Sequence, residues 1–519
     1  MKKTVLAQSE LAGWLASVGD GATVVTTGSG GGLLEPDELL AGFEAAFLKT
    51  GHPAQLTLVH ALGIGDKSAK GTNRFAHEGM VKRVIGGHWT WSPKMLDMAR
   101  DGEIEAYCLP SGAIVHLVRE IGAGRPGLFT HVGLGTFVDP RLGGGRVNAN
   151  TTEEIVELAT IDGREYLRYK PFKVDIGLVR GTVADEDGNI SAIEEPADLD
   201  AYNVALAAHN CGGKVIAQVR EIVPRGTIRP REVSIPGNLV DAIVVCPEQM
   251  QTYFGDYDLS LAGLVQSDEH PPMPDFSDAM RRIIAGRAAQ ELVPGSTLNF
   301  GFGMSADVAA LIAQRGAKGE YWFTVEQGLH NGSLMTGDLF GIARNPSAIV
   351  SSAAQFDLYS GGGLDQTFLG MAEMDGHGNV NVSHIAGRMS GPGGFIDITQ
   401  GARSIVFCGS FAAKGLKVHA ADGQLTIASH GQIPKLVEHV SGITFSGAEA
   451  IRRGQQVTYV TERAVFRLTA EGIELIEVAP GVDIQRDILD RMAFTPIVRS
   501  PKPMDAALFA SSDALTHAY

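Results

Sequence analysis

The sequence predicts an α/β fold made of two similar open α/β domains with mainly parallel sheets. Three observations predict this fold. Short apolar runs end in glycine, helical patterns lie between these runs, and the same motifs occur in both halves of the chain. Apolar, β-branched runs of this kind are typical of strands buried on both faces of a parallel sheet. Strand followed by helix followed by strand then favours right-handed crossovers. The expected strands lie at 22–28, 55–63, 174–181, 214–219, 296–303, 321–328 and 403–409, and the expected helices include 277–292 and 305–316.

Two motifs recur in the same order in both halves, which predicts an internal duplication. A strand, a glycine loop and a helix contain Gly28 in the first half and Gly301 in the second, 273 residues later. The acidic turns DEDGNIS and DGHGNVNVS place Asn189 and Asn379 only 190 residues apart. The first half therefore carries about 83 additional residues, which we place between about 60 and 170.

The proline-rich segment DEHPPMPDFS at 268–277 predicts the boundary between the halves, because prolines so closely spaced interrupt helices and central strands. We therefore expect an N-terminal domain over 1–268, a linker over 269–276 and a C-terminal domain over 277–519. We expect the active site to lie between the two domains.

The composition is that of a globular protein and argues against several classes of partner. The chain has 519 residues, a net charge of −16 and 44% hydrophobic residues, whereas proteins that bind nucleic acid need a basic face. Four scattered cysteines imply neither a disulfide framework nor a zinc site. No apolar run approaches 18 residues and no signal peptide is evident, so we expect a cytoplasmic protein without a membrane partner.

Glycine is unusually frequent, at 65 of 519 residues, and gathers in loops. The loop 28–32, with Gly28, Gly30 and Gly31, follows an expected strand and precedes a helix, so it is either a ligand-binding loop or a purely structural turn. The sequence GFGMSA, which begins at Gly301, matches G-x-G-x-x-A and predicts, as an alternative function, an NAD-dependent dehydrogenase. A Walker A motif is absent from the sequence.

Glu326 directly follows the expected buried strand YWFTV and precedes a glycine-rich turn. Ligands of open α/β sheets bind at the carboxyl ends of strands, so this carboxylate is a candidate base, metal ligand or nucleophile. A metal is disfavoured because no second acid or histidine lies at ligand spacing, although His330 is near in sequence. An ordinary strand-end glutamate is the alternative reading. Two further glycine loops, Gly361-Gly362-Gly363 and Gly391-Pro392-Gly393-Gly394, favour a long, thin ligand or an oxyanion pocket of backbone amides.

Taken together, these segments resemble the family I coenzyme A transferases of the fused-subunit type, which include propionate and short-chain acyl-CoA:acetate CoA-transferases. The resemblance covers nearly the whole chain. The segments that show the resemblance include TVEQGLHNG around Glu326, YSGGGLDQTFLGMAEMDGHGNVNVS, GPGGFIDI, FAHEGMVKRVIGGHW, GTFVDPRLGGGRVN and IEVAPGVDIQRDIL.

The resemblance implies a ping-pong transfer of CoA from a short-chain acyl-CoA to a carboxylate such as acetate. Glu326 would be the nucleophile, passing through an acyl-glutamyl anhydride and a γ-glutamyl-CoA thioester. Gly393 or Gly394 would supply the backbone oxyanion donor. CoA is then a substrate and covalent intermediate, with no permanently bound cofactor and no metal. The remaining candidate contacts with CoA or substrate are Gly28, Gly30, Gly31, Ser111, Asn299, Gly301, Gly361, Gly362 and Gly363.

One position departs from the family pattern. The family's first half usually supplies a glutamine side chain, in a Pro-Gln-Gly turn, as a second oxyanion donor. Here the turn reads Leu109-Pro110-Ser111-Gly112, and a serine can donate only through its shorter hydroxyl or a bridging water. We expect a homo-oligomer, and a non-catalytic CoA-binding regulator is the other alternative function.

Overall fold

The computed structural model describes residues 3–269 and 271–510, which divide into two compact units. Of the described residues, the first unit comprises 3–269, 325–357 and 386–397, and the second comprises 271–324, 358–385 and 398–510. The first boundary coincides with the proline-rich segment. Two segments of the sequence's second half, however, belong to the first unit, so the compact units differ from the predicted sequence halves. The division at 268 and 277 stays a prediction about the duplicated halves.

The first unit is built on a sheet of eight strands that are all parallel, in the order β1-β14-β12-β9-β2-β3-β4-β5. Its central strands are buried along nearly their whole length, as expected for a sheet covered on both faces. Their bounds are β1 Thr4–Leu6, β2 Thr23–Thr26, β3 Leu56–His60, β4 Val81–Gly86, β5 Glu105–Cys108, β9 Ile176–Arg180, β12 Lys214–Val219 and β14 Ala242–Val245.

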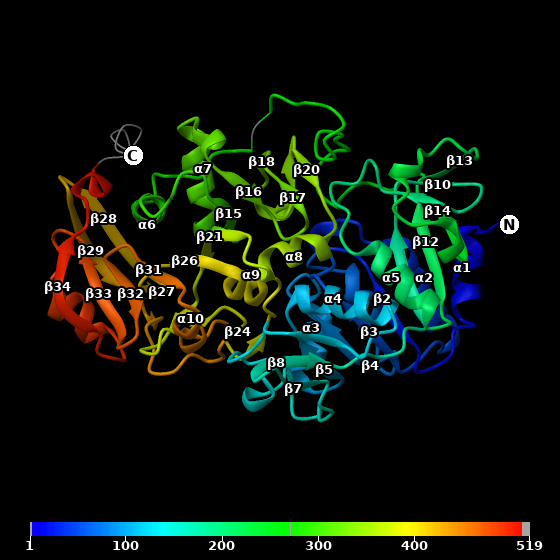
Figure 1. Ribbon diagram of the computed structural model, residues 1–519, viewed down its shortest axis with the longest axis horizontal. Coiled ribbons are helices and arrows are strands. Elements are labelled where there is room, and N and C mark those ends of the chain that lie inside the picture. Colours follow the sequence, from blue (N-terminus) through cyan, green and yellow to red (C-terminus); the bar gives the residue numbers. More distant parts are fainter. Residues whose placement is uncertain (1–2, 270, 511–519) are drawn as a thin grey trace. The chain divides into compact units, whose positions relative to one another are not determined.

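Five helices of this unit cover the sheet and its edge. Helices α4 and α5 pack on each other, and α5 contacts β9 and β12, whereas α1 packs on α2 (Figure 1). The bounds are α1 Gln8–Leu15, α2 Asp37–Thr50, α3 Pro93–Asp101, α4 Ser111–Gly122 and α5 Ala201–Asn210. The residues between 60 and 170 form β4, β5, α3, α4 and an antiparallel sheet of β6 Leu128–Thr130, β8 Arg164–Tyr169 and β7 Val156–Ile161.

The second unit contains a mixed sheet in which β16, β15, β21, β26 and β31 are parallel neighbours and β32, β33 and β34 continue the order. Helices α6 and α7 pack on each other beside it (Figure 1). The bounds are β15 Thr297–Phe300, β16 Trp322–Thr324, β21 Leu364–Gly370, β26 Ala402–Cys408, β31 Gln456–Val460, β32 Ala464–Thr469, β33 Gly472–Val478, β34 Ile497–Pro503, α6 Ala279–Ala289, α7 Ala306–Gln314 and α10 Gly447–Arg453.

The remaining elements are short. Two of the boundaries between the units fall inside helices, α8 Ser352–Ser360 and α9 Phe395–Gly401. The small strands are β10 Val183–Asp185, β11 Ile190–Ser191, β13 Glu221–Val223, β17 Leu329–His330, β18 Ser333–Leu334, β19 Ala343–Arg344, β20 Ala348–Ile349, β22 Glu373–Met374, β23 Val380–Asn381, β24 His384–Ile385, β25 Arg388–Met389, β27 Ala412–Ala413, β28 Leu416–Ala421, β29 Gln424–His430 and β30 Ile433–Pro434.

Each expected strand and helix appears, and the α/β prediction is confirmed. The two units also share a core of five parallel strands. Its order is β3-β2-β9-β12-β14 in the first unit and β16-β15-β21-β26-β31 in the second. Several expected strands are shorter than predicted, and the difference matters most for β16, which ends at Thr324 rather than continuing to 328. The chain turns sharply there, which changes the setting of Glu326.

The repeated acidic turns have the same hydrogen bonds in both units. Asn189 Nδ2 donates to Asp185 Oδ2 at 2.8 Å, and its Oδ1 accepts from the Gly237 amide at 2.9 Å. In the second unit, Asn379 Nδ2 donates to Asp375 Oδ2 at 3.0 Å, and its Oδ1 accepts from the Gly447 amide at 3.0 Å. Matching side-chain networks at matching positions in two folds support the duplication inferred from the sequence.

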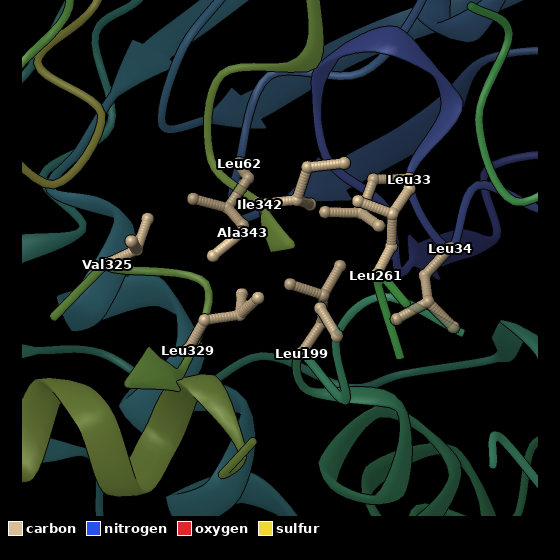
Figure 2. Packing of buried hydrophobic residues seen from close by; sticks show 10 residues of the cluster. Leu33, Leu34, Leu62, Leu199, Leu261, Val325, Leu329, Ile342 and Ala343 are labelled. Carbon is tan, nitrogen blue, oxygen red and sulfur yellow. The ribbon is translucent and has the colours of Figure 1, made fainter. Parts of the chain in front are cut away.

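A hydrophobic cluster holds segment 325–357 in the first unit (Figure 2). Val325, Leu329, Ile342 and Ala343 of this segment pack with apolar residues that are far away in the sequence, and burial of several such side chains stabilises the arrangement. These distant members are Leu33, Leu34, Leu62, Ala197, Leu199 and Leu261. Because Val325 precedes Glu326 directly, the cluster also fixes the position of the predicted nucleophile.

No helix within the described ranges 3–269 and 271–510 is both long enough and apolar enough to cross a bilayer.

Candidate active site

Glu326 lies in a tight turn between β16 and β17. The turn is closed by the Val325 amide, which donates to the Leu329 carbonyl at 3.0 Å, and by the Gly328 amide, which donates to the Val325 carbonyl at 2.9 Å. Gly328 has a φ of 98°, and a Cβ there would clash with the Val350 carbonyl, so only glycine fits. The sequence EQG thus folds into a rigid corner that presents the Glu326 side chain.

The Glu326 carboxylate meets a backbone amide of the predicted oxyanion loop. The Gly394 amide donates a hydrogen bond to it, and a Cβ on Gly394 would clash with Glu326 Oε2. Gln327 Nε2 approaches the other oxygen, Oε1, at 3.4 Å. Burial raises the pKa of Glu326 to about 7, and the two hydrogen bonds oppose this shift. A carboxyl with that pKa is substantially ionised at neutral pH and more basic than an ordinary carboxylate.

Gly393 and Gly394 differ in what their amides contact. The Gly393 amide donates to the Gly87 carbonyl at 2.9 Å, and the Gly393 carbonyl accepts from the Ser111 amide at 2.9 Å. Gly393 therefore anchors the loop on β4's following turn and on the start of α4. Of the two glycines, only Gly394 directs its amide at Glu326.

Ser111 lies in the same neighbourhood, but its hydroxyl is already engaged. Ser111 Oγ donates to the Ala61 carbonyl at 2.7 Å, and the side chain is fully buried. The Gly87 backbone passes so close that a Cβ there would come within 2.6 Å of Ser111 Oγ. The Ser111 side chain is therefore enclosed by protein, and its hydroxyl proton is used in the bond to Ala61.

Asp397, three residues after Gly394, is a buried carboxyl that the sequence analysis did not single out. It accepts a hydrogen bond from the Gly112 amide at 3.1 Å, at the first turn of α4. Burial raises the pKa of Asp397 well above its ordinary value, the Gly112 amide opposes that rise, and the negative charge of Glu326 adds to it. The GPGGFID motif thus contains both a contact to Glu326 and an anchor on α4.

The first glycine loop is packed by aromatic rings. A Cβ on Gly30 would clash with the Trp91 ring, and a Cβ on Gly32 would come within 2.7 Å of the Tyr253 ring. The Gly31 amide donates to the Gly65 carbonyl at 3.1 Å. Gly28 has a φ of 135°, which disfavours other residues. Within the described structure, packing or backbone conformation explains why glycine occupies each of these positions. Ser29, which lies between them, contacts Gln327 Nε2 through its Oγ at 3.4 Å.

Glu35, next to this loop, is a second carboxyl whose pKa burial raises to about 7. It accepts hydrogen bonds from the Tyr253 hydroxyl and from the Gly65 amide, both at 2.8 Å. Its side chain is fully buried, and these bonds tie three separate loops together. A raised pKa thus accompanies a structural role at Glu35, whereas at Glu326 the carboxylate is half-buried and faces an oxyanion-type donor.

The predicted residues of the second unit occupy other positions in its sheet. Asn299 lies on β15, and its Nδ2 donates to the Thr324 carbonyl at 3.3 Å while its Oδ1 accepts from Thr367 Oγ1 at 3.2 Å. The Gly301 amide donates to the Phe368 carbonyl at 2.8 Å. Gly361, Gly362 and Gly363 directly follow α8, and the Gly362 and Gly363 amides donate to carbonyls of its last turn at 3.0 and 2.9 Å.

Comparison with known proteins gives the class. Residues 12–246 match the family model described as coenzyme A transferase. The chain is 40% identical over 493 residues to acetate CoA-transferase YdiF of Escherichia coli O157:H7, covering 94% of this chain and 92% of that protein. It is 42% identical over 501 residues to caffeate CoA-transferase of Acetobacterium woodii, covering 95% of each.

Solved structures agree with this. The apoenzyme of YdiF from Escherichia coli O157:H7 superposes with a TM-score of 0.92 at 38% identity, covering 99% of this chain and 97% of that chain. Its thioester complex with CoA gives a TM-score of 0.91, covering 98% and 97%.

The chain belongs to the family I coenzyme A transferases of the fused type and is a CoA-transferase. Family membership decides among the three functions left open by the sequence: the dehydrogenase suggested by GFGMSA and the non-catalytic regulator are not supported, and the resemblance is confirmed.

Proposed function

We propose that this enzyme moves CoA from a short-chain acyl-CoA to a carboxylate acceptor such as acetate, with Glu326 as the nucleophile. The observation that carries the proposal is the Glu326 carboxylate, held in a rigid turn with the Gly394 amide directed at one of its oxygens. A preorganised donor at that place stabilises negative charge where it develops during acyl transfer.

The reaction proceeds in two half-reactions. A Glu326 oxygen attacks the thioester carbonyl carbon, a tetrahedral oxyanion forms, and its collapse breaks the C–S bond and releases CoA thiolate, leaving an acyl-glutamyl anhydride. The thiolate then attacks the glutamyl carbonyl carbon, and collapse releases the donor carboxylate and leaves a γ-glutamyl-CoA thioester. The acceptor carboxylate reverses these steps and takes the CoA.

In the second attack the oxyanion forms on an oxygen of Glu326 itself. The Gly394 amide, which donates to the Glu326 carboxylate, is suited to stabilise this charge, because a backbone N–H cannot rotate away. The raised pKa of Glu326 also serves the first attack, since a more basic carboxylate is a stronger nucleophile. Partial burial protects the anhydride from water.

The identity of the acyl group is proposed from the relatives. One relative is named for acetate and another for caffeate, so acids of very different size are named among proteins of similar sequence. Acetate is our first choice, and a panel of short-chain and aromatic acids, each tested with its CoA ester, ranks the alternatives by kcat/KM.

Further roles remain proposals for this chain. Asn299, Gly301 and Gly361–Gly363 are proposed contacts of the CoA chain, and Gly28, Gly30 and Gly31 are proposed to shape the site near Ser29. We also propose that CoA is the only cofactor-like molecule, used as a substrate, and that the enzyme works as a homo-oligomer in the cytoplasm.

Trapping tests the proposal directly. Enzyme incubated with acyl-CoA and then reduced with borohydride should show a changed mass in the peptide spanning 321–332, and the Glu326→Gln variant should not. Isotope exchange between labelled acetate and acetyl-CoA should proceed without nicotinamide and should stop in Glu326→Gln. Labelling of a different peptide, or exchange that persists in this variant, contradicts the proposal.

A further inference from the structure

The side chain of Gln327 lies beside the proposed nucleophile with its amide only loosely bonded. Nε2 is 3.4 Å from Glu326 Oε1 and 3.4 Å from Ser29 Oγ. Oε1 of Gln327 is buried and has no hydrogen-bond partner in the described part of the chain, although the side chain is only 3% exposed. A buried amide with weak and missing bonds contributes poorly to stability, so its presence needs another explanation.

The orientation of this amide follows from its surroundings. A carboxylate accepts hydrogen bonds and cannot donate them when ionised, so the NH₂ group rather than the carbonyl oxygen must face Glu326. The Gly341 backbone confines the amide from another direction, since a Cβ there would come within 2.7 Å of Gln327 Nε2. The N–H donor is therefore preorganised beside Oε1.

Ser111 cannot supply a second hydrogen-bond donor to the Glu326 carboxylate, because both of its donor groups already bond to backbone carbonyls. Its hydroxyl donates to the Ala61 carbonyl at 2.7 Å and its amide to the Gly393 carbonyl at 2.9 Å. Within residues 3–269 and 271–510, the Gly394 amide is the backbone donor found on the Glu326 carboxylate, and the turn at 109–112 contains no glutamine. Gln327 Nε2 is the side-chain amide that lies next to Oε1 of this carboxylate.

We propose that Gln327 Nε2 is the second oxyanion donor of this enzyme and replaces the glutamine that the 109–112 turn lacks; this rests on the proposed role of Glu326. Oε1 attacks the thioester carbonyl carbon, a C–O bond forms, and the carbonyl electron pair moves to the substrate oxygen. That oxyanion is attached to the carbon bonded to Oε1, so it lies within reach of Nε2. Collapse returns the pair, breaks the C–S bond and releases CoA thiolate, while the amide keeps its protons.

The long contact in the resting structure agrees with such a role. Catalytic hydrogen bonds are often long in free enzymes and shorten as charge develops. A tight bond to the carboxylate would stabilise the ground state and lower the reactivity of Oε1. The 3.4 Å contact avoids this and leaves the donor available for the substrate oxygen.

Two variants of nearly unchanged volume test the proposal. Gln327→Met removes the donor, and Gln327→Glu replaces it with an acceptor. We expect the rate of Glu326 loading in a single turnover with acyl-CoA to fall about 100- to 1,000-fold in Gln327→Met, as for loss of one oxyanion donor, and further in Gln327→Glu. Gln8→Ala, which alters an exposed glutamine of α1, should load at the wild-type rate.

A second readout separates catalysis from structure. Because the Gln327 contact lowers the pKa of Glu326, the acid limb of the pH–rate profile should move to higher pH in Gln327→Met, while thermal stability should not fall. Loading of Glu326 at the wild-type rate in Gln327→Met overturns the role of Gln327 and leaves Glu326 as the nucleophile. Mass labelling that misses Glu326 in the wild-type enzyme overturns the proposed function instead.

Discussion

The Asp397 carboxyl accepts a hydrogen bond from the Gly112 amide at 3.1 Å and so caps helix α4 from a distant part of the chain. The residue preceding α4, Pro110, makes no side-chain cap, and the first amides of a helix need acceptors. Because Gly394 lies three residues before Asp397, this bond also fixes the loop that contacts Glu326. One carboxyl thus supports both a helix end and the candidate active site.

Asp397→Ala should lower the free energy of unfolding by about 1–2 kcal/mol, the usual cost of losing a helix cap, and should also lower kcat. Asp397→Asn keeps an acceptor oxygen, so it should retain most of the stability and activity. Urea unfolding and steady-state kinetics of both variants measure this. Equal losses of stability and kcat in the two variants would show that the charge of Asp397, and not its hydrogen bond to Gly112, supports the helix end and the site.

Gly394→Ala should reduce kcat/KM by about 100-fold or more, because the added methyl group would clash with Glu326 Oε2 and displace the amide donor. The matched control is Gly13→Ala in helix α1, where a Cβ has no atom within 4 Å. That change should leave activity unaltered and add about 0.5–1 kcal/mol of stability. An active Gly394→Ala enzyme would rule out this amide as the donor.

The pH dependence of the rate should report Glu326. Since the carboxylate must be ionised to attack and its pKa is raised to about 7, kcat/KM should rise about tenfold per pH unit below 7 and level off above it. Glu35 has a similar pKa, so the Glu35→Gln variant is the control and should keep the same profile. A midpoint near 4.5 in the wild-type enzyme would contradict the raised pKa.

The same shift should cost the protein stability at high pH. Glu326 binds a proton more tightly in the folded state than in the unfolded state, so its contribution is complete below pH 4.5 and is lost as pH rises through 7. Glu326→Gln should therefore be more stable than the wild type at pH 8, by up to about 3 kcal/mol, with a smaller difference at pH 5. Thermal midpoints of both proteins at pH 5 and pH 8 measure this. A wild-type enzyme that is more stable than Glu326→Gln at pH 8 would contradict it.

Periodicity and glycine placement were sufficient to predict the sheet strands, because a buried parallel strand has a local signature. The same local reading extended the strand at 321–328 too far, since the turn at Glu326 depends on Gly328 meeting the Val350 carbonyl. The assignment of 325–357 to the first unit was not predictable either. It depends on the packing of Leu329 and Ile342 with Leu33, which are contacts of high sequence separation.

Part of the candidate site is also predictable from the sequence. The strand end and the family resemblance predict Glu326 and Gly394 as site residues, and the structure shows the Gly394 amide donating to the Glu326 carboxylate; their catalytic roles stay predictions. The sequence does not distinguish Gly393 from Gly394 as the donor to Glu326. Only the fold shows that the Gly393 amide is used in a hydrogen bond to the Gly87 carbonyl. Gln327 is not predicted from the sequence although it adjoins Glu326, since the role proposed for it depends on the bond between Ser111 Oγ and the Ala61 carbonyl, which has no local sequence signal.

The cluster around Val325 and Leu329 has a consequence for any attempt to express the protein as two polypeptides. A gene divided between residues 269 and 270 would place Glu326 on the C-terminal product, while the leucines that bury its flanking residues would remain on the N-terminal product. Neither product could then assemble the nucleophile's surroundings alone, and recovered turnover on mixing would measure how well the fragments complement each other.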